Sequence, residues 1–237
     1  MIMRTCIKSV VTVLFVSLAA SCSYQEQSFT DRDIYEVFGP VKELNTVRKV
    51  YMEDGNEVDN TWYDDAQWST RFDENGFVTY FAEYDVTYDE AYKSCVYHME
   101  GENQNGKFYS TYEFSLDTIQ NGIKLNGEWN GTNGGGLYQI ECCFDAQRRP
   151  TIMHRSVDDV FFTSMQTCYQ RTYFYQGEEK LPFKMECALN SGGWEMKPTM
   201  LIKYDGVDQY GNWLNRKIYD EETMKLYFEE TRTISYY

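Results

Sequence analysis

The sequence predicts an all-β fold: an antiparallel meander of hairpin repeats, forming a curved sheet or an open barrel, behind one short N-terminal helix. Aromatic residues make up 17% of the chain, with 21 tyrosines, and tyrosine favours half-buried pleated surfaces. Polar and apolar residues alternate with period two over residues 107–114 and 224–229, a pattern typical of half-buried strands. Asn-Gly and Asp-Gly pairs, which supply the positive φ angles of hairpin turns, recur along the chain: Asp54-Gly55, Asn75-Gly76, Asn105-Gly106, Asn121-Gly122 and Asp205-Gly206, with Tyr210-Gly211-Asn212 as a related turn.

The first residues predict export. Arg4 and Lys8 precede an apolar run over residues 9–20, the order found in a secretory signal. The run is shorter than the roughly 20 residues of a membrane-spanning helix. Small residues then stand directly before Cys22, an ending that resembles the lipobox of bacterial lipoproteins.

This resemblance implies a division of the chain. Residues 1–21 are a signal peptide, Cys22 carries the lipid, residues 22–29 form a tether, and residues 30–237 form one β-hairpin-repeat domain. Ser23 after the cysteine resembles lipoproteins sent to the outer membrane, and only one acid, Glu26, follows closely. The expected location is therefore an outer-membrane lipoprotein in the cell envelope, on the periplasmic face rather than the cell surface.

A helix is predicted at the start of the domain. Thr30 is a candidate N-cap with Asp33 as its capping-box partner, and Gly39-Pro40 ends the segment. An apolar side for this helix comes from Ile34, Tyr35, Val37 and Phe38.

About a dozen strands are expected from Val41 onward, at the usual spacing of strands and turns. No crossover helices separate them, which argues for antiparallel pairing. Whether the sheet closes is left open.

The net charge of the chain limits the kinds of partner that it is expected to bind. The formal charge is −15; without the signal, 20 basic residues stand against 37 acidic ones, giving −17. Such a chain repels phosphate backbones and anionic headgroups, so nucleic acid is not an expected partner.

The cysteines that remain after the signal and Cys22 are odd in number, and they are interpreted as small buried hydrophobes or as partly paired: Cys95, Cys142, Cys143, Cys168 and Cys187.

Three segments share an aromatic–Asp pair that leads into a turn: residues 72–76, 144–151 and 204–213. Asp is expected to cap the turn with its side chain, while Gly or a substitute takes the left-handed position. Residues 72–76, together with Phe38–Glu43, Asp208–Arg216 and Glu230–Tyr237, resemble the YD-repeat (Rhs-like) family, in particular the small YD-like lipoproteins of Bacteroidetes-type bacteria. Arg148 or Arg149 departs from that pattern by standing where a Gly is usual. The resemblance implies a hairpin array on a lipid anchor, with no catalytic residue.

Catalytic and metal chemistry find little support. The chain has no Gly-x-Ser-x-Gly elbow, and its only imidazoles are His98 and His154. Cys95 and His98 would face opposite sides of a strand. No zinc or calcium spacing is present, so no catalytic residue, metal or other cofactor is predicted.

Aromatic rings near strand ends are the candidate binding residues, because a ring at the rim of a sheet can stack on a sugar; the same rings can equally fill a core. They are Trp62, Trp68, Trp129, Trp194 and Trp213. Separately, Asp117-Thr118-Ile119 resembles an O-glycosylation site of exported Bacteroidetes proteins, with Thr118 as the acceptor.

The leading hypothesis is a non-enzymatic envelope lipoprotein, attached to the membrane through its lipid, that binds or scaffolds a glycan or an envelope protein. A glycan hydrolase with two carboxylates about 5–10 Å apart is one alternative. The other is an assembly subunit whose open sheet edge, over Thr223–Tyr237, recruits a partner strand.

Overall fold

The computed structural model describes residues 29–51, 56–57, 67–103, 106–132, 134–159, 165–191 and 194–237. One helix, α1 (Asp31–Ile34), precedes the strands, and no helix in these ranges is long and apolar enough to cross a membrane. The strands are β1 (Val41–Val50), β2 (Gln67–Phe72), β3 (Val78–Phe81), β4 (Tyr84–Tyr88), β5 (Ser94–Asn103), β6 (Gly106–Ile119), β7 (Gly122–Gly131), β8 (Gly134–Phe144), β9 (Pro150–Asp159), β10 (Met165–Phe174), β11 (Lys184–Ser191), β12 (Trp194–Met196), β13 (Thr199–Tyr204), β14 (Asn215–Asp220) and β15 (Leu226–Tyr236).

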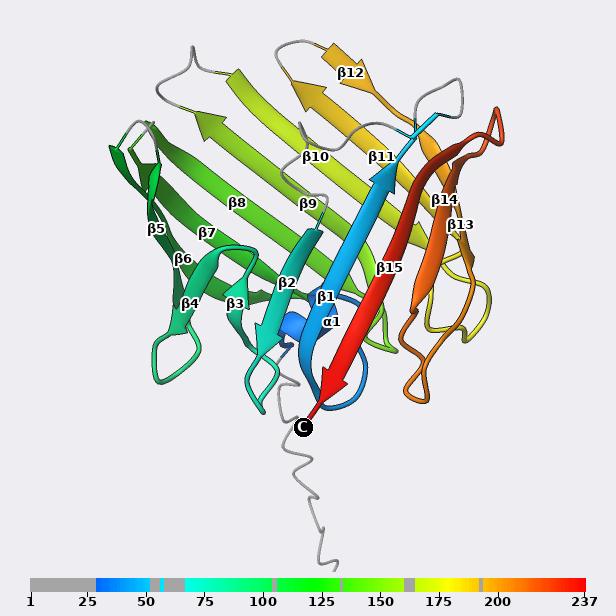
Figure 1. Cartoon of the computed structure of the whole chain (residues 1–237), viewed down its shortest axis with the longest axis horizontal. Coiled ribbons are helices and arrows are strands. Elements are labelled where there is room, and N and C mark those ends of the chain that lie inside the picture. The colour runs from blue at the N-terminus through cyan, green and yellow to red at the C-terminus, as the bar shows by residue number, and fades with distance from the viewer. Residues whose placement is uncertain are drawn as a thin grey trace, which may run out of the picture.

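The strands form one antiparallel sheet that closes on itself (Figure 1). The predicted all-β antiparallel meander is confirmed, whereas the predicted curved sheet or open barrel is wrong because the ring is complete. The pairing of β1 with β15 closes the ring, because it joins the first strand of the meander to the last. β10 and β11, which follow one another in the chain, pair along Thr167–Phe174 like the other neighbouring strands. Since β12 pairs only with β11, the other fourteen of the fifteen strands make up the ring.

Closure also removes the proposed recruiting edge. Thr223–Tyr237 contains β15, which is hydrogen-bonded to β1 on one side and to β14 on the other. It therefore has no free edge for a partner strand.

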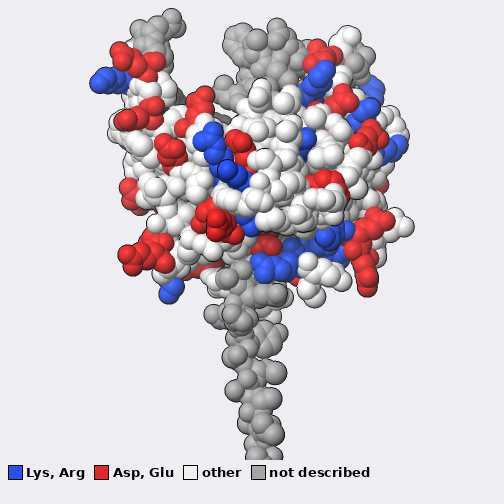
Figure 2. All heavy atoms as spheres, turned by 60° about the horizontal axis from the view of Figure 1, so that its bottom comes forward, with Lys and Arg blue, Asp and Glu red and all other residues white. Residues whose placement is uncertain are grey.

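The outer wall of the barrel is polar. Alternation in β1 turns Leu44 and Thr46 inward, both fully buried, and leaves Asn45 and Lys49 outside. Acidic and basic side chains are scattered over the visible surface (Figure 2). A barrel that spans a bilayer carries an apolar outer band, so this outer wall is built to face water. Outward polar pairs run along the strands: Glu43–Arg71, Asn45–Ser69, Asn126–Gln139, Lys184–Glu221 and Lys217–Glu229.

One end of the barrel is filled by residues 29–40, which we call the plug. The predicted capping box at Thr30 is present: the Thr30 amide donates to the Asp33 carboxylate at 2.8 Å. The α1 helix lies inside the lower end of the barrel (Figure 1). Val37 joins a buried core with residues of many strands, among them Leu44, Phe72 and Phe114. The lower end is therefore a packed floor.

Plug contacts reach turns all around the floor. Arg32 donates to the carbonyl of Asp73 at 2.7 Å, and Arg148 forms a bidentate ion pair with Asp33, at 3.0 and 2.5 Å. At the far side, Asn212 binds the backbone of Phe38 in both directions, accepting at 2.6 Å and donating at 2.9 Å.

Asp31 makes the plug sensitive to pH. Its buried carboxylate accepts hydrogen bonds from the Val78 amide at 2.7 Å and the Tyr88 hydroxyl at 2.6 Å. Burial outweighs these bonds and raises the pKa of Asp31 from 3.8 to about 6. The folded state then holds a proton that the unfolded state has lost, so stability falls as pH rises from about 4 to about 6.

We expect Asp31→Asn to be more stable than the wild type at pH 7.5, by up to about 3 kcal/mol, because the amide keeps an acceptor oxygen without the buried charge. Near pH 4 the difference should nearly vanish. Urea denaturation at both pH values measures it. A variant less stable than the wild type at both pH values would contradict the prediction.

A single turn geometry recurs at the floor, in turns that begin at Asp73, Asp89, Asp145 and Asp208. In each turn, the backbone carbonyl of the Asp accepts a hydrogen bond from the amide three residues later. The carboxylate of the same Asp accepts a second bond, of 2.7–3.0 Å, from the amide four residues later. Asp capping is thus confirmed for the first and second predicted segments. In the third segment the repeat begins at Asp208 rather than at the aromatic–Asp pair.

The residue three after the Asp takes positive φ in every case: Gly76 at 96°, Tyr92 at 53°, Arg148 at 63° and Gly211 at 90°. Arg148 thus occupies the left-handed position where glycine is the easiest fit. Its ion pair with Asp33 of the plug accounts for an arginine there.

Candidate functional site

The inner wall carries arginines between apolar and aromatic residues. Strand alternation turns the following side chains inward: Arg48 (β1), Arg155 (β9), Arg171 (β10), Arg216 (β14) and Arg232 (β15). Each guanidinium lies over an aromatic ring, which is a favourable cation–π contact: Arg48 over Trp68 and Phe228, Arg155 over Tyr138, Arg171 over Tyr169, and Arg216 and Arg232 over Trp213.

An ionic network ties two of these arginines together. Glu230, 1% exposed, lies between Arg48, at 2.7 Å, and Arg216. Arg216 also contacts Glu36 of the plug at 3.5 Å. Burial alone raises the pKa of Glu230, but the charges of Arg216 and Arg48 outweigh it and lower that pKa to about 2.

Arg232 is less completely satisfied. Its Nη2 donates to the carbonyl of Tyr35 at 3.3 Å, but its buried Nε and Nη1 have no hydrogen-bond partner. Burial, together with the neighbouring charge of Arg216, lowers the pKa of Arg232 to about 9.

Higher on the wall lies a cluster of rings centred on Tyr112, which we call the aromatic platform. Trp129 stacks with Tyr112 at a centroid distance of 6.3 Å, while Tyr84 and Tyr138 each meet Tyr112 edge-on at 5.5 Å. The buried Nε1 of Trp129 has no hydrogen-bond partner. Arg155 adjoins the platform, with its guanidinium 4.8 Å from the Tyr138 ring.

Water reaches this inner wall. Arg155 faces inward yet is exposed, and Trp68, Trp129 and Phe228 are only half-buried. A ring of about 8 strands is just filled by its own side chains, whereas rings of about 16–18 leave a channel. A ring of fourteen strands lies between these sizes. The exposed Arg155 and the half-buried rings show that the end opposite the plug, which we call the mouth, leads to an accessible inner surface.

The five predicted tryptophans fall into different places. Trp68 and Trp129 lie on the inner wall, and Trp213 is fully buried under Arg216 and Arg232. Trp194 belongs to β12, but its side chain lies outside the described set, as does the whole of Trp62. Elsewhere, Thr118 is exposed near the end of β6, and Cys22 lies outside the described residues.

Sequence reasoning missed the inward arginines. A signal was available, because Arg171 stands between Tyr169 and Tyr173, and Arg155 between Met153 and Val157, at spacings of two. An arginine in an otherwise apolar alternation is typical of a cation on a buried face.

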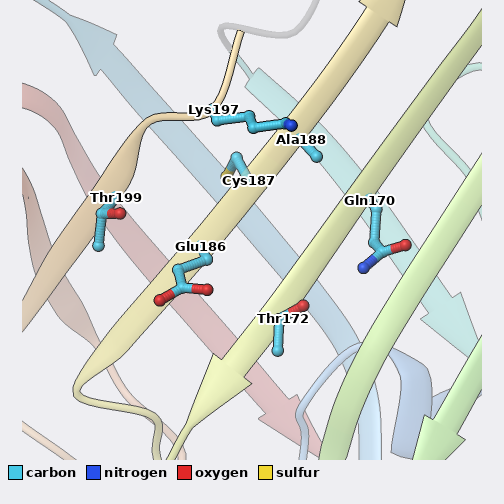
Figure 3. Close-up of a pocket in the computed structure, with 7 residues that line it drawn as sticks. All are labelled: Gln170, Thr172, Glu186, Cys187, Ala188, Lys197 and Thr199. Carbon is cyan, nitrogen blue, oxygen red and sulfur yellow. The ribbon is translucent and has the colours of Figure 1, made fainter.

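A second cluster lies on the outer wall, where β10, β11 and the start of β13 form a shallow depression (Figure 3). Polar side chains from three segments border it, including Gln170, Glu186 and Lys197. Beside it, the imidazole Nε2 of His154 lies 2.9 Å from the thiol of Cys168. The two residues are on neighbouring strands, which is why their proximity was not predicted.

Cys95 and His98, in contrast to Cys168 and His154, do not lie together. Cys95 is buried while His98 bonds Thr111 at 2.9 Å on the outer face, so the two lie on opposite faces as expected. No group of three potential metal ligands occurs within the ranges given above. All of the thiols there are unpaired: Cys95, Cys142, Cys143, Cys168 and Cys187.

Fold and site together define an all-β antiparallel barrel whose outer wall faces water and whose arginine and aromatic side chains face inward. No protein-family model matches the chain, and no curated protein does. Among solved structures, a porin-like protein from Bacteroides vulgatus ATCC 8482 is similar at 10% identity, covering 84% of this chain and 99% of that one, with a TM-score of 0.49. A porin-like protein from Bacteroides uniformis ATCC 8492 has 6% identity over the same shares and a TM-score of 0.34. Likeness at this level carries no inference about function.

Proposed function

We propose that this chain is a non-enzymatic envelope lipoprotein that binds a glycan against the inner wall of its barrel. One observation carries the proposal: the half-buried ring of Trp129 lies beside Tyr112 on a wall that water reaches. Sugar rings present C–H faces that stack on such aromatics.

Neighbouring polar groups suit the same ligand. The Tyr84 hydroxyl donates to Ser110 at 3.3 Å, and Arg155 is exposed beside the platform. Binding sites for small ligands combine apolar walls with a few such polar groups.

The inner-wall acids argue against a hydrolase. Glu230 is ion-paired on both sides and its pKa is about 2, so it has no proton to donate at neutral pH. Asp31 is enclosed in the floor by Val78 and Tyr88. A general acid near the platform is therefore not among these groups.

The lipid anchor would set the orientation. Phe29, the first described residue, stacks on Phe144 at the floor. A tether over residues 22–29 spans at most about 25–30 Å when extended. With lipid on Cys22, the floor would face the membrane and the mouth would point away from it.

We expect a glycan-array screen of the full chain in detergent to find selective binding. The affinity should fall at least about tenfold in Trp129→Ala, because an aromatic anchor at the centre of a site is a typical hot spot. Titration calorimetry with the best array ligand measures the loss.

Tyr109→Ala supplies the matched control, since Tyr109 is an exposed aromatic on the outer face of the neighbouring strand. It should bind as the wild type does. Equal loss in both variants, or unchanged binding in Trp129→Ala, would place the ligand elsewhere.

A further inference from the structure

We propose that the ligand is an anionic saccharide, and that Arg155 binds its carboxylate or sulfate group while Trp129 and Tyr112 stack on its ring. This inference rests on the proposed function and adds the charge class of the ligand. It comes from the distribution of charge between the two faces of the barrel.

The two walls differ in the cations they carry. Apart from Arg71, which pairs with Glu43, the outward cations named here are lysines that pair with acids, such as Lys184 with Glu221 at 3.4 Å and Lys217 with Glu229 at 3.6 Å. Inward positions carry arginines, as described above. A planar guanidinium can stack on an aromatic ring and still present paired N–H donors to a carboxylate or sulfate, which an ammonium group cannot do.

Positive charge is left over on the wall beside the platform. Arg155 has no carboxylate within ion-pair distance among the described residues, and its neighbours across the strands are Ile140 and Tyr169. Arg171, one position further toward the floor, donates to the Tyr169 hydroxyl at 2.5 Å and likewise has no described acid partner. In a chain of formal charge −15, this inward excess of positive charge is a local exception.

The position of Arg171 makes the excess informative, because Arg171 is half-buried whereas Arg155 is exposed. Removing a cation from water is costly unless an opposite charge compensates it. The opposite wall compensates Arg48 and Arg216 with Glu230, whereas the wall of β8 to β10 uses tyrosines instead. An anionic ligand would supply the missing charge.

The platform favours a saccharide over a free inorganic anion. The Arg155 guanidinium lies over Tyr138, and Tyr138 meets Tyr112, which stacks with Trp129. Cation and stacking surface are therefore continuous. A small anion needs no aromatic surface, but an acidic sugar presents a ring and a charge side by side.

The test is titration calorimetry of the full chain in detergent with three tetrasaccharides: an oligogalacturonate, a sulfated chondroitin and a neutral galactan. We expect at least one anionic probe to bind at least about tenfold more tightly than the neutral one, and to weaken as salt is added. The carboxylated and sulfated probes show which anion is preferred.

Variants assign the effect to Arg155. Arg155→Gln should lose about tenfold in affinity for the anionic probe and none for the neutral one, and Arg155→Lys should lose less. Lys124→Gln, which changes an outward cation, should bind as the wild type does. Because Arg155 is exposed, the variants should fold, and their thermal unfolding checks this.

Failures of the two proposals are distinguishable. Neutral and anionic probes that bind equally well, or an Arg155→Gln variant of unchanged affinity, overturn the inference. If binding still depends on Trp129, the proposed function survives that result. No binding of any probe, together with an empty glycan array, overturns both.

Discussion

Replacing Glu230 with alanine is expected to lower the free energy of unfolding by about 3–5 kcal/mol, the usual cost of breaking a buried ion pair. The carboxylate is 1% exposed and is bound by Arg48 and Arg216. Its removal leaves two inward cations without the carboxylate that they share, while Arg216 keeps its contact with Glu36. Urea denaturation measures the change.

Glu43→Ala is the control, since Glu43 pairs with Arg71 at 3.2 Å on the outer wall and both side chains are substantially exposed. That pair should contribute less than about 1 kcal/mol. Equal effects of the two substitutions would show that the inner network adds no stability.

The same network predicts an acid response. The pKa of Glu230 is lowered to about 2 from 4.5, so its contribution is complete above pH 4.5 and is lost as pH falls toward 2. The gap in stability between wild type and Glu230→Ala should therefore narrow across that range.

The second large effect is expected for Asn212→Ala, which should lower the free energy of unfolding by about 3 kcal/mol. Asn212 is fully buried, binds the amide and carbonyl of Phe38, and also donates to Asp208 at 3.0 Å. Alanine leaves these buried backbone groups without partners, and each such group costs about 1–3 kcal/mol. Denaturation reports the total, and amide exchange at Phe38 reports release of the plug.

Asn126→Ala is the matched control. Asn126 accepts from Gln139 at 2.7 Å on the outer wall, where water can replace the bond. Its loss should be less than about 1 kcal/mol. Protection of the Phe38 amide that persists in Asn212→Ala would show that other contacts retain the plug.

Local features of this fold were predictable because they depend on neighbours in sequence. The capping box at Thr30 and Asp33, and the turn at residues 73–77, follow from side chains that bond backbone a few residues away. The substitution at Arg148 was recognised as a departure, but its reason, a contact with Asp33 across 115 positions, is tertiary.

Closure was not predictable from the same information. A curved sheet and a ring share the same hairpins and differ in the pairing of β1 with β15, which joins residues such as Arg48 and Glu230 across 182 positions. Strand number, tilt and register must agree around the whole ring. The inward arginines were missed for a related reason, since alternation gives two faces but only closure makes one of them an interior.

The pairing of the first strand with the last also sets the order of folding. Val41 pairs with Tyr236, one residue from the end of the sequence shown. The ring therefore cannot close until nearly all of these residues have been synthesised, and such distant contacts form slowly. A chain that is exported as its signal predicts would remain open during synthesis and transport, and would complete its barrel only after its final strand had crossed.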